Sequence, residues 1–219
     1  MITRQPLSGV RRLIAQRMSI AHQEIPPVTF VEECDFSGID LRLVVALCLK
    51  AIADSLPDFP EMNSQLDGDE IVYRDTYDIG LAVTTPRGLM VPVVRDCGGL
   101  TVEEIDDEVK RLSTLAKSGR ISPADMRGSS ITFTSPGKVG GLFATPIINY
   151  PESAIVGLHR IGERPVVRDG QIVVRPIGNL SLTFDHRLVD GARAGEFCLS
   201  VIEALRARAT MSIAREGGE

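Results

Sequence analysis

The stretch Ser181-Leu-Thr-Phe-Asp-His-Arg-Leu-Val-Asp-Gly-Ala192 joins the last predicted strand, Asn179 to Phe184, to the last predicted helix, Gly191 to about Ala209. A side chain that leaves a strand at such a junction can project into a cleft from a rigid backbone, which is a common position for a general base. His186 holds this position, although a lone histidine is more often a hydrogen-bonded structural residue. Asp190, taken alone, fits a helix cap or a residue that fixes the local turn.

Upstream of this stretch, hydrophobic periodicity and turn residues predict alternating helices and strands. The predicted helices are Ser8 to about Gln23, Leu41 to Leu56, and a helix that follows a capping box of Thr101 and Glu104 and ends at Gly119. The predicted extended segments are Val28 to Asp35, two stretches between Glu70 and Val94 around Thr85-Pro86-Arg87-Gly88, Ile131 to Ser135, and Pro165 to Val167 with Gln171 to Val174 around Asp169-Gly170. A Gly-rich turn is expected after Ser135. Strands that follow each other directly favour one α/β domain over residues 1–219, with a mixed sheet and flexible ends at 1–5 and 210–219.

Composition limits the classes of function. The chain has 219 residues, 43% of them hydrophobic, and a net charge of −5 without a basic stripe, which argues against a nucleic-acid partner or an anionic membrane surface. No apolar run reaches the ~18 residues of a membrane span, and no secretory signal is recognisable. The four cysteines lie far apart without a CxxC pair, so reduced, buried thiols and no metal site are expected. These observations predict a soluble protein of the bacterial cytoplasm, with the mitochondrial matrix as the alternative.

Four blocks, in order, resemble the catalytic inner-core domain of the dihydrolipoamide acyltransferases of 2-oxoacid dehydrogenase complexes. The block Asp185-His-Arg-Leu-Val-Asp-Gly-Ala192 resembles the DHRxxDG signature of that family, and its HxxxDG part is shared with chloramphenicol acetyltransferase. The other blocks resemble the family's opening helix, its central hairpin, and its active-site strand with the following loop: Pro6 to Met18, Asp78 to Pro92, and Thr132 to Gly141 with Thr145 to Glu152.

The resemblance implies an α/β fold of the chloramphenicol-acetyltransferase-like kind, a two-layer sandwich with a mixed β-sheet. It implies transfer of an acyl group from S-acyl-dihydrolipoamide to coenzyme A, with His186 as the base that takes the thiol proton. Thr134 would donate a hydrogen bond to the oxyanion and, with Ser135, contact coenzyme A. Asp190 would orient the site by pairing with Arg11. Without the resemblance, Thr134 would be an ordinary strand threonine and Arg11 a solvated charge on a helix.

The same resemblance implies a homotrimer whose active sites lie between subunits, so that His186 of one subunit faces Thr134 of its neighbour. Coenzyme A would be a substrate, and the lipoyl group would come from another domain or chain, because no lipoyl or peripheral-subunit-binding domain is recognised here. Decarboxylase and dihydrolipoamide dehydrogenase components would be further partners.

Two departures from the family pattern modify these expectations. Only Phe36 to Asp40 stands where family members have a longer basic stretch, which predicts a weaker hold on coenzyme A. The ending Ala214 to Glu219 is polar where the family has an apolar tail, which argues against a large cubic or dodecahedral assembly. A coenzyme A-dependent acyltransferase with a small-molecule acceptor and an inactive structural core remain as alternatives, and the sequence does not specify the acyl group.

Overall fold

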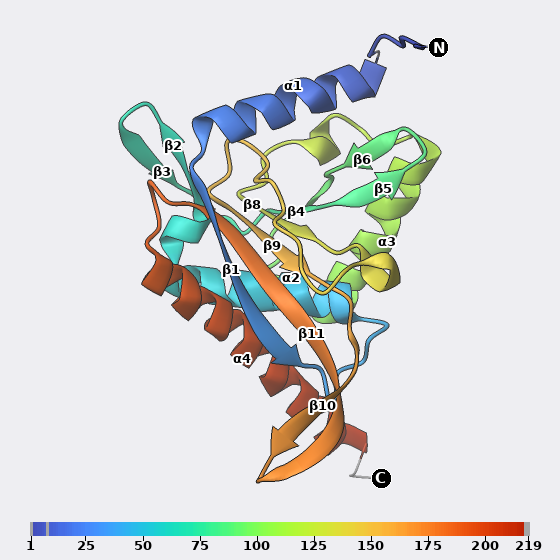
Figure 1. Cartoon of the computed structure of the whole chain (residues 1–219), viewed down its shortest axis with the longest axis vertical. Coiled ribbons are helices and arrows are strands. Elements are labelled where there is room, and N and C mark those ends of the chain that lie inside the picture. Colours follow the sequence, from blue (N-terminus) through green and yellow to red (C-terminus); the bar gives the residue numbers. More distant parts are fainter. Residues whose placement is uncertain (1, 8, 217–219) are drawn as a thin grey trace.

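One mixed β-sheet forms the centre of the computed structural model, which describes residues 2–7 and 9–216, except for the side chains of 138 and 209–216. The strand order is β1-β11-β9-β8-β4-β7, and β10 pairs with the first half of β11 (Figure 1). Strand β8 is parallel to β9 and to β4, and the other pairs are antiparallel, so the predicted mixed sheet is confirmed. The strands of this sheet are β1 (Pro27–Asp35), β4 (Ile79–Leu81), β7 (Val93–Val94), β8 (Ile131–Thr134), β9 (Ala154–Leu158), β10 (Gly162–Arg168) and β11 (Gln171–Asp185).

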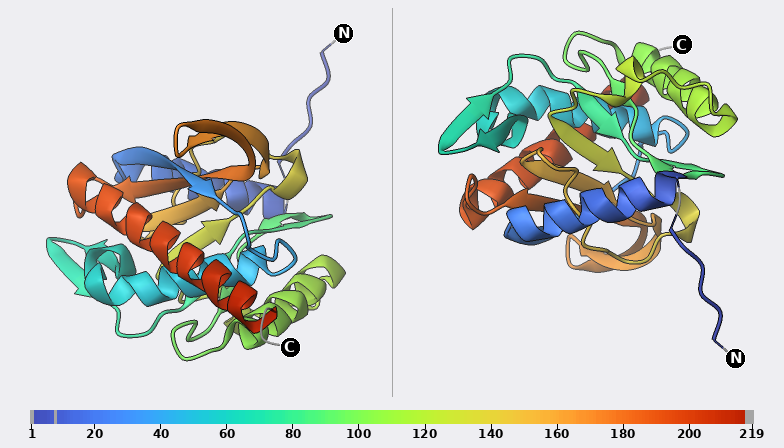
Figure 2. Two further views of the ribbon diagram at one scale, coloured as in Figure 1. Left: turned by 90° about the horizontal axis from the view of Figure 1, so that it is seen from below. Right: turned by 90° about the horizontal axis from the view of Figure 1, so that it is seen from above.

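Three of the four α-helices cover one face of this sheet, while α1 lies apart from them across the end of the molecule at the top of Figure 1. Figure 2 shows α4 in front of α1 when the molecule is seen from below, and α1 in front when it is seen from above. The helices are α1 (Gly9–Glu24), α2 (Val44–Ser55), α3 (Val102–Ser118) and α4 (Gly191–Glu216), and short 3-10 turns occupy Leu56–Asp58, Pro60–Asn63, Ala124–Met126 and Gly137–Val139. No helix among the described residues is long and apolar enough to cross a membrane.

The two faces of the sheet differ in polarity. Along β11 the side chains of Leu180, Leu182 and Phe184 belong to the hydrophobic core beneath the helices. The alternate residues Ser181 and Thr183 are also buried, and they point to the opposite face because successive strand side chains alternate. Along β11 this second face is therefore buried and polar, and the register places Thr134 of β8 on the same face, opposite Gly157 and Ser181.

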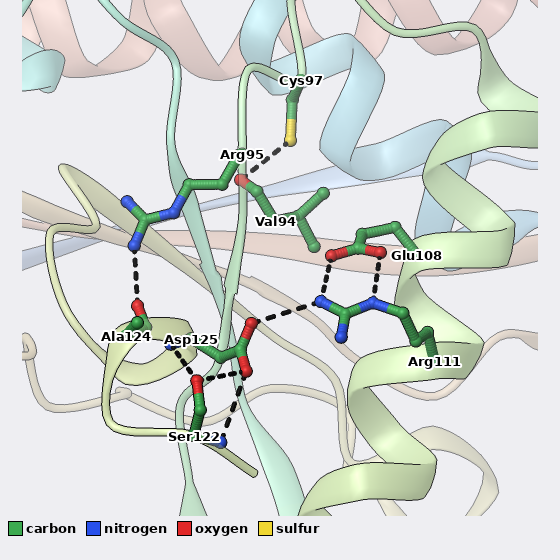
Figure 3. A network of polar contacts seen from close by, with 8 residues as sticks. All are labelled: Val94, Arg95, Cys97, Glu108, Arg111, Ser122, Ala124 and Asp125. Atoms are coloured by element: carbon green, nitrogen blue, oxygen red, sulfur yellow. Dashed lines mark hydrogen bonds and ion pairs between the residues drawn. The ribbon is translucent and has the colours of Figure 1, made fainter.

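Helix α3 and the segment after it hold the start of β8 in place. The predicted capping box is confirmed, with Thr101 N 2.8 Å from Glu104 Oε2 and Glu104 N 3.2 Å from Thr101 Oγ1. Figure 3 shows how Asp125 accepts hydrogen bonds from Ser122 Oγ at 2.6 Å and from Arg111 Nη2 at 3.2 Å. These contacts fix the segment that leads into β8.

Several sequence predictions need correction. The two stretches predicted between Glu70 and Val94 are five short strands, although the expected hairpin at Pro86-Arg87 is present. They include β3 (Glu70–Tyr73), which pairs with the unpredicted β2 (Ser64–Asp67), and the hairpin of β5 (Val83–Thr85) with β6 (Gly88–Met90). The helix predicted from Leu41 begins at Val44, because residues 41–43 form a turn. Ser8 and 217–219, which the predictions for the first helix and the polar ending include, lie outside the described residues.

The hairpin at Asp169-Gly170 is confirmed, and both residues have positive φ, 51° and 76°. The strands expected on either side of Pro176, however, form one continuous strand, β11. Pro176 lies where β10 and β1 both reach β11, and its carbonyl accepts a hydrogen bond from Phe36 N at 2.8 Å. At this transition between partner strands, the missing N–H of proline does not end the strand.

The cysteines are free and buried, as predicted. Burial raises the pKa of Cys34, Cys97 and Cys198 to about 12. The thiols are therefore protonated and unreactive at neutral pH.

Candidate active site

His186 lies in a tight turn directly after β11. The preceding Asp185 is 2% exposed, and its carboxylate accepts hydrogen bonds from three atoms of Arg187: N at 3.0 Å, Nε at 3.0 Å and Nη2 at 2.6 Å. The backbone N of His186 donates to Pro26 O at 3.2 Å. The imidazole is exposed, with its ring 5.7 Å from that of Phe184. The backbone of the turn is therefore fixed while the imidazole remains accessible, as a general base requires.

Thr134 is the last residue of β8 and is half-buried. Ser135 follows it, also half-buried, and its Oγ accepts a hydrogen bond from Gly137 N at 3.3 Å. Gly137 has a φ of 60°, a left-handed conformation that favours glycine. The Gly-rich segment is thus a tight turn next to Thr134, as the sequence predicts.

The strand register shows that Thr134 and His186 of one chain are far apart. Thr134 pairs with Gly157 of β9, and Gly157 pairs with Ser181 of β11. Two strand spacings of about 4.8 Å, and the rise of about 3.3 Å for each residue from Ser181 to His186, separate their Cα atoms by roughly 20 Å. The two side chains therefore cannot act on the same carbonyl within one chain.

Asp190 and Arg11 are both exposed and form no ion pair with each other in this chain. The backbone O of Asp190 accepts the first-turn hydrogen bond from Ala194 N at 3.0 Å, so Asp190 marks the start of α4. Arg11 lies near the start of α1, whose rise places it roughly 20 Å from Pro26, the residue that contacts the His186 turn. The pairing of Arg11 with Asp190 stays a prediction.

The sequence reasoning missed a buried carboxyl group beside the site. Glu152 is 3% exposed and accepts hydrogen bonds from Ser129 Oγ at 2.5 Å, Thr132 Oγ1 at 2.6 Å and Asn149 Nδ2 at 2.6 Å. Burial raises its pKa to about 7, against the opposing effect of these three donors. In the sequence, Glu152 and its partner Asn149 stand only as members of the block from Thr145 to Glu152. The other two partners, Ser129 and Thr132, lie at least 20 positions away.

A second buried group was also missed. His159, directly after β9, is 4% exposed, and its Nε2 lies 2.8 Å from Ser181 Oγ, while Nδ1 has no hydrogen-bond partner. Burial lowers the pKa of His159, which keeps the ring neutral at pH 7. Gly157 lies beside this pair, and a Cβ there would be 2.5 Å from Ser181 Oγ, so only glycine fits. Gly157 is the residue opposite Thr134 in the sheet, and the buried His159 lies two residues after it.

A cavity of about 540 Å³ lies between α1 and this polar face. Ala21, His22 and Ile25 line it on one side, and Thr29 and Thr183 on the sheet, where their hydroxyls are 2.8 Å apart. The loop 145–148 completes the wall. The cavity is mostly apolar with a few hydroxyls, the composition typical of small-molecule sites.

The sequence matches the model of the 2-oxoacid dehydrogenases acyltransferase (catalytic domain) family over residues 1–213. The chain belongs to this family. A succinyltransferase component of the 2-oxoglutarate dehydrogenase complex from Haemophilus influenzae is 38% identical to it, and the match covers 92% of this chain and 53% of the relative. An acetyltransferase component of the pyruvate dehydrogenase complex from Bacillus subtilis is 40% identical, over 88% of this chain and 47% of the relative. The chain thus spans about half the length of these curated relatives.

Solved structures support the same family and fold. A probable dihydrolipoamide acetyltransferase from Listeria monocytogenes superposes with a TM-score of 0.89 and 32% identity, covering 94% of this chain and 95% of the other. The dihydrolipoamide acetyltransferase of Azotobacter vinelandii gives a TM-score of 0.88 and 30% identity, over 94% and 91% of the two chains. Chloramphenicol acetyltransferase, with a TM-score of 0.56 and 15% identity over 87% and 94%, shows the shared fold. The predicted family and the predicted two-layer fold are therefore confirmed.

Proposed function

We propose that this acyltransferase domain transfers an acyl group from S-acyl-dihydrolipoamide to coenzyme A, and that residues 1–219 form a single catalytic domain. The observation that carries the proposal is an exposed imidazole on a rigid turn, in a chain of this family. The Azotobacter vinelandii acetyltransferase was examined for the role of a serine, a histidine and an asparagine in its catalytic mechanism. These three residues are separated by the same intervals as Thr134, His186 and Asp190 in this chain. A threonine hydroxyl in place of serine keeps the donor.

In the proposed reaction, neutral His186 removes the proton from the thiol of coenzyme A as the sulfur attacks the thioester carbon. The carbonyl oxygen gains the negative charge, and the Thr134 hydroxyl donates a hydrogen bond to it. When the tetrahedral intermediate collapses, the bond to the lipoyl sulfur breaks and His186 returns the proton to that sulfur. The products are acyl-coenzyme A and dihydrolipoamide, and no metal or redox step is needed. Ser135 contacts coenzyme A, and Asp190 with Arg11 orients the site.

If Thr134 and His186 act on the same carbonyl, the distance between them within one chain means that they come from two copies of the chain. A closed ring with heterologous contacts brings the Thr134 end of one chain to the His186 end of the next, and a trimer is the smallest such ring. We propose a homotrimer with the active sites between subunits, and a lipoyl-bearing domain, a decarboxylase and a dihydrolipoamide dehydrogenase as partners. These partners are proposed because relatives of the chain are components of pyruvate and 2-oxoglutarate dehydrogenase complexes.

The short segment from Phe36 to Asp40 lies between β1 and the turn before α2. Phe36 is 1% exposed and Ser37 Oγ donates to Asp35 Oδ1 at 2.6 Å, so this segment is a packed turn without a basic side chain. Weaker binding of coenzyme A is expected as a consequence. Activity with a high KM for coenzyme A would agree with this reading.

The test is a transfer assay on the purified protein with S-acetyl-, S-succinyl- and branched-chain S-acyl-dihydrolipoamide as donors and coenzyme A as acceptor. Formation of acyl-coenzyme A that depends on His186 supports the proposal, and the preferred donor identifies the acyl group. A panel of small alcohols and amines tests the alternative acceptor class. Calorimetry with coenzyme A tests the inactive core, because a scaffold that binds no coenzyme A and transfers nothing would contradict the proposal.

A further inference from the structure

The carboxylate of Glu152 is bonded to the strand that ends at Thr134. Its Oε2 lies 2.6 Å from Thr132 Oγ1, and Thr132 is two positions before Thr134, on the same face of β8. Its Oε1 lies 2.5 Å from the Oγ of Ser129, which stands just before the strand. Gly80 of the neighbouring β4 confines this contact, because a Cβ there would be 2.7 Å from Thr132 Oγ1. Glu152 therefore fixes β8 near its active-site end.

The backbone around Glu152 is bonded in turn to the segment that carries His186. Asn149 Nδ2 donates to Glu152 Oε1 at 2.6 Å, and Glu152 N donates to Asn149 O at 3.1 Å, which closes the turn before β9. The next carbonyl, that of Ser153, accepts a hydrogen bond from Asp185 N at 2.8 Å. Asp185 begins the His186 turn. The carboxylate of Glu152 and the backbone carbonyl of Ser153 thus connect Thr132 with Asp185.

Burial of this carboxyl group is not explained by stability alone. Its donors are two hydroxyls and one amide, all neutral, so no ion pair offsets its desolvation. Apolar residues of similar volume would fill the same space at lower cost. What the carboxylate adds is three directional bonds, two to Ser129 and Thr132 at the start of β8 and one to Asn149 in its own turn, which together specify one arrangement of the backbone.

We propose that Glu152 is a positioning residue for acyl transfer, which holds the Thr134 end and the His186 end of the sheet in a fixed relation within each chain. The inference rests on the proposed function. In a ring of subunits each chain gives Thr134 to one site and His186 to another, so a shift inside one chain misaligns two sites. A displacement of about 1 Å at a catalytic group lowers the rate by on the order of 10²-fold.

The first test compares Glu152→Gln with Glu152→Leu in the transfer assay. The amide of glutamine can replace the carboxylate, because a serine or threonine hydroxyl accepts as well as donates. We expect Glu152→Gln to keep kcat within about threefold of wild type, and Glu152→Leu to lose on the order of 10²-fold in kcat with an unchanged KM for coenzyme A. Thr101→Ala, which removes the cap of α3 far from the site, is the control for lost stability and should keep its kcat. Wild-type kcat in a folded Glu152→Leu protein, or equal losses in both Glu152 variants, would overturn the proposal.

The second test needs no substrate and leaves Glu152 in place. Thr132→Val keeps the shape of the side chain but removes the hydroxyl that contacts Glu152. We expect faster amide hydrogen exchange at 184–188, in a different segment of the chain, as well as at 131–135, whereas Thr101→Ala should leave 184–188 unchanged. Unchanged exchange at 184–188 in Thr132→Val would refute the connection. If wild-type protein transfers no acyl group but the exchange result holds, the proposed function fails while the link through Glu152 stands.

Discussion

Arg187 and Asp185 form a two-pronged ion pair across the turn that carries His186. Nε of Arg187 lies 3.0 Å from Oδ1 of Asp185, and Nη2 lies 2.6 Å from Oδ2. Such a bidentate pair restricts both side chains. Because the imidazole is exposed, its direction depends on the backbone of this turn rather than on packing around the ring.

Replacing Arg187 by lysine should therefore impair catalysis without unfolding the protein. Lysine keeps the charge but cannot form the planar fork. We expect Arg187→Lys to lower kcat by about tenfold, with a smaller change in KM, measured by steady-state acyl transfer. Arg168→Lys is the matched control, because Arg168 at the end of β10 also pairs with a carboxylate, that of Asp35 at the end of β1, at 3.1 Å. Equal losses in both variants would show that the Arg187 pair has no special role.

Substitution of His186 should remove the base. We expect His186→Ala to lower kcat by on the order of 10²–10⁴-fold. The Tm should stay near that of wild type, since the ring is exposed. A purified variant with near-wild-type turnover would exclude the mechanism.

Thr134 should act through its hydroxyl. Thr134→Val keeps the shape of the side chain, so we expect a loss of about 10²-fold or more in kcat with little change in KM. Thr134→Ser keeps the donor and should remain active. Equal rates for the valine and serine variants would remove Thr134 from the mechanism.

Local signals predicted what is local in this fold. The capping box of Thr101 and Glu104 and the turn at Asp169-Gly170 depend on residues within three positions of each other, and both are present. The DHRxxDG block gave the position of His186 for the same reason. Strand β9 was missed because a buried apolar run of five residues has no alternation, and β11 was predicted as two separate strands, Gln171 to Val174 and Asn179 to Phe184.

The contacts that organise the site are not local. Glu152 meets Thr132 and Ser129 only after β8 and β9 pair, and His159 meets Ser181 only after β9 and β11 pair. The separation of Thr134 from His186 likewise follows from register, which the sequence does not state. Sequence patterns thus supplied the catalytic candidates, whereas their spatial relation and their supports required the sheet.

Glu152 should make the stability of the fold depend on pH. Burial raises its pKa from 4.5 to about 7 in the folded chain. Arg17, Arg74 and Arg127 line the same cavity of about 410 Å³, and their positive charges favour the ionised form of the carboxyl group. Between these two pKa values the folded chain binds more protons than the unfolded chain, so stability falls as pH rises through this window, by up to roughly 3 kcal/mol.

Urea unfolding of wild type and Glu152→Gln at several pH values measures this effect. Glutamine does not titrate, so the difference in unfolding free energy between the two proteins should change from about pH 4.5 to about pH 7. The comparison is needed because His159, whose pKa is lowered by burial, contributes the opposite slope in both proteins. A difference that is constant with pH would show that Glu152 does not titrate in this window.

The separation of Thr134 from His186 leads to a prediction about assembly. If each site takes Thr134 from one chain and His186 from the next, neither single variant is active alone, but a mixed ring contains interfaces with both wild-type residues. In the experiment, His186→Ala and Thr134→Val chains are unfolded, mixed in equal amounts and refolded together. The mixture should regain about a quarter of the wild-type rate, because random assembly gives both wild-type residues to about a quarter of the interfaces. The same two proteins mixed after assembly are the control and should stay inactive. Light scattering should report about three chains per particle. An active monomer, or co-refolded variants that stay inactive although they form mixed rings, would contradict a site shared between subunits.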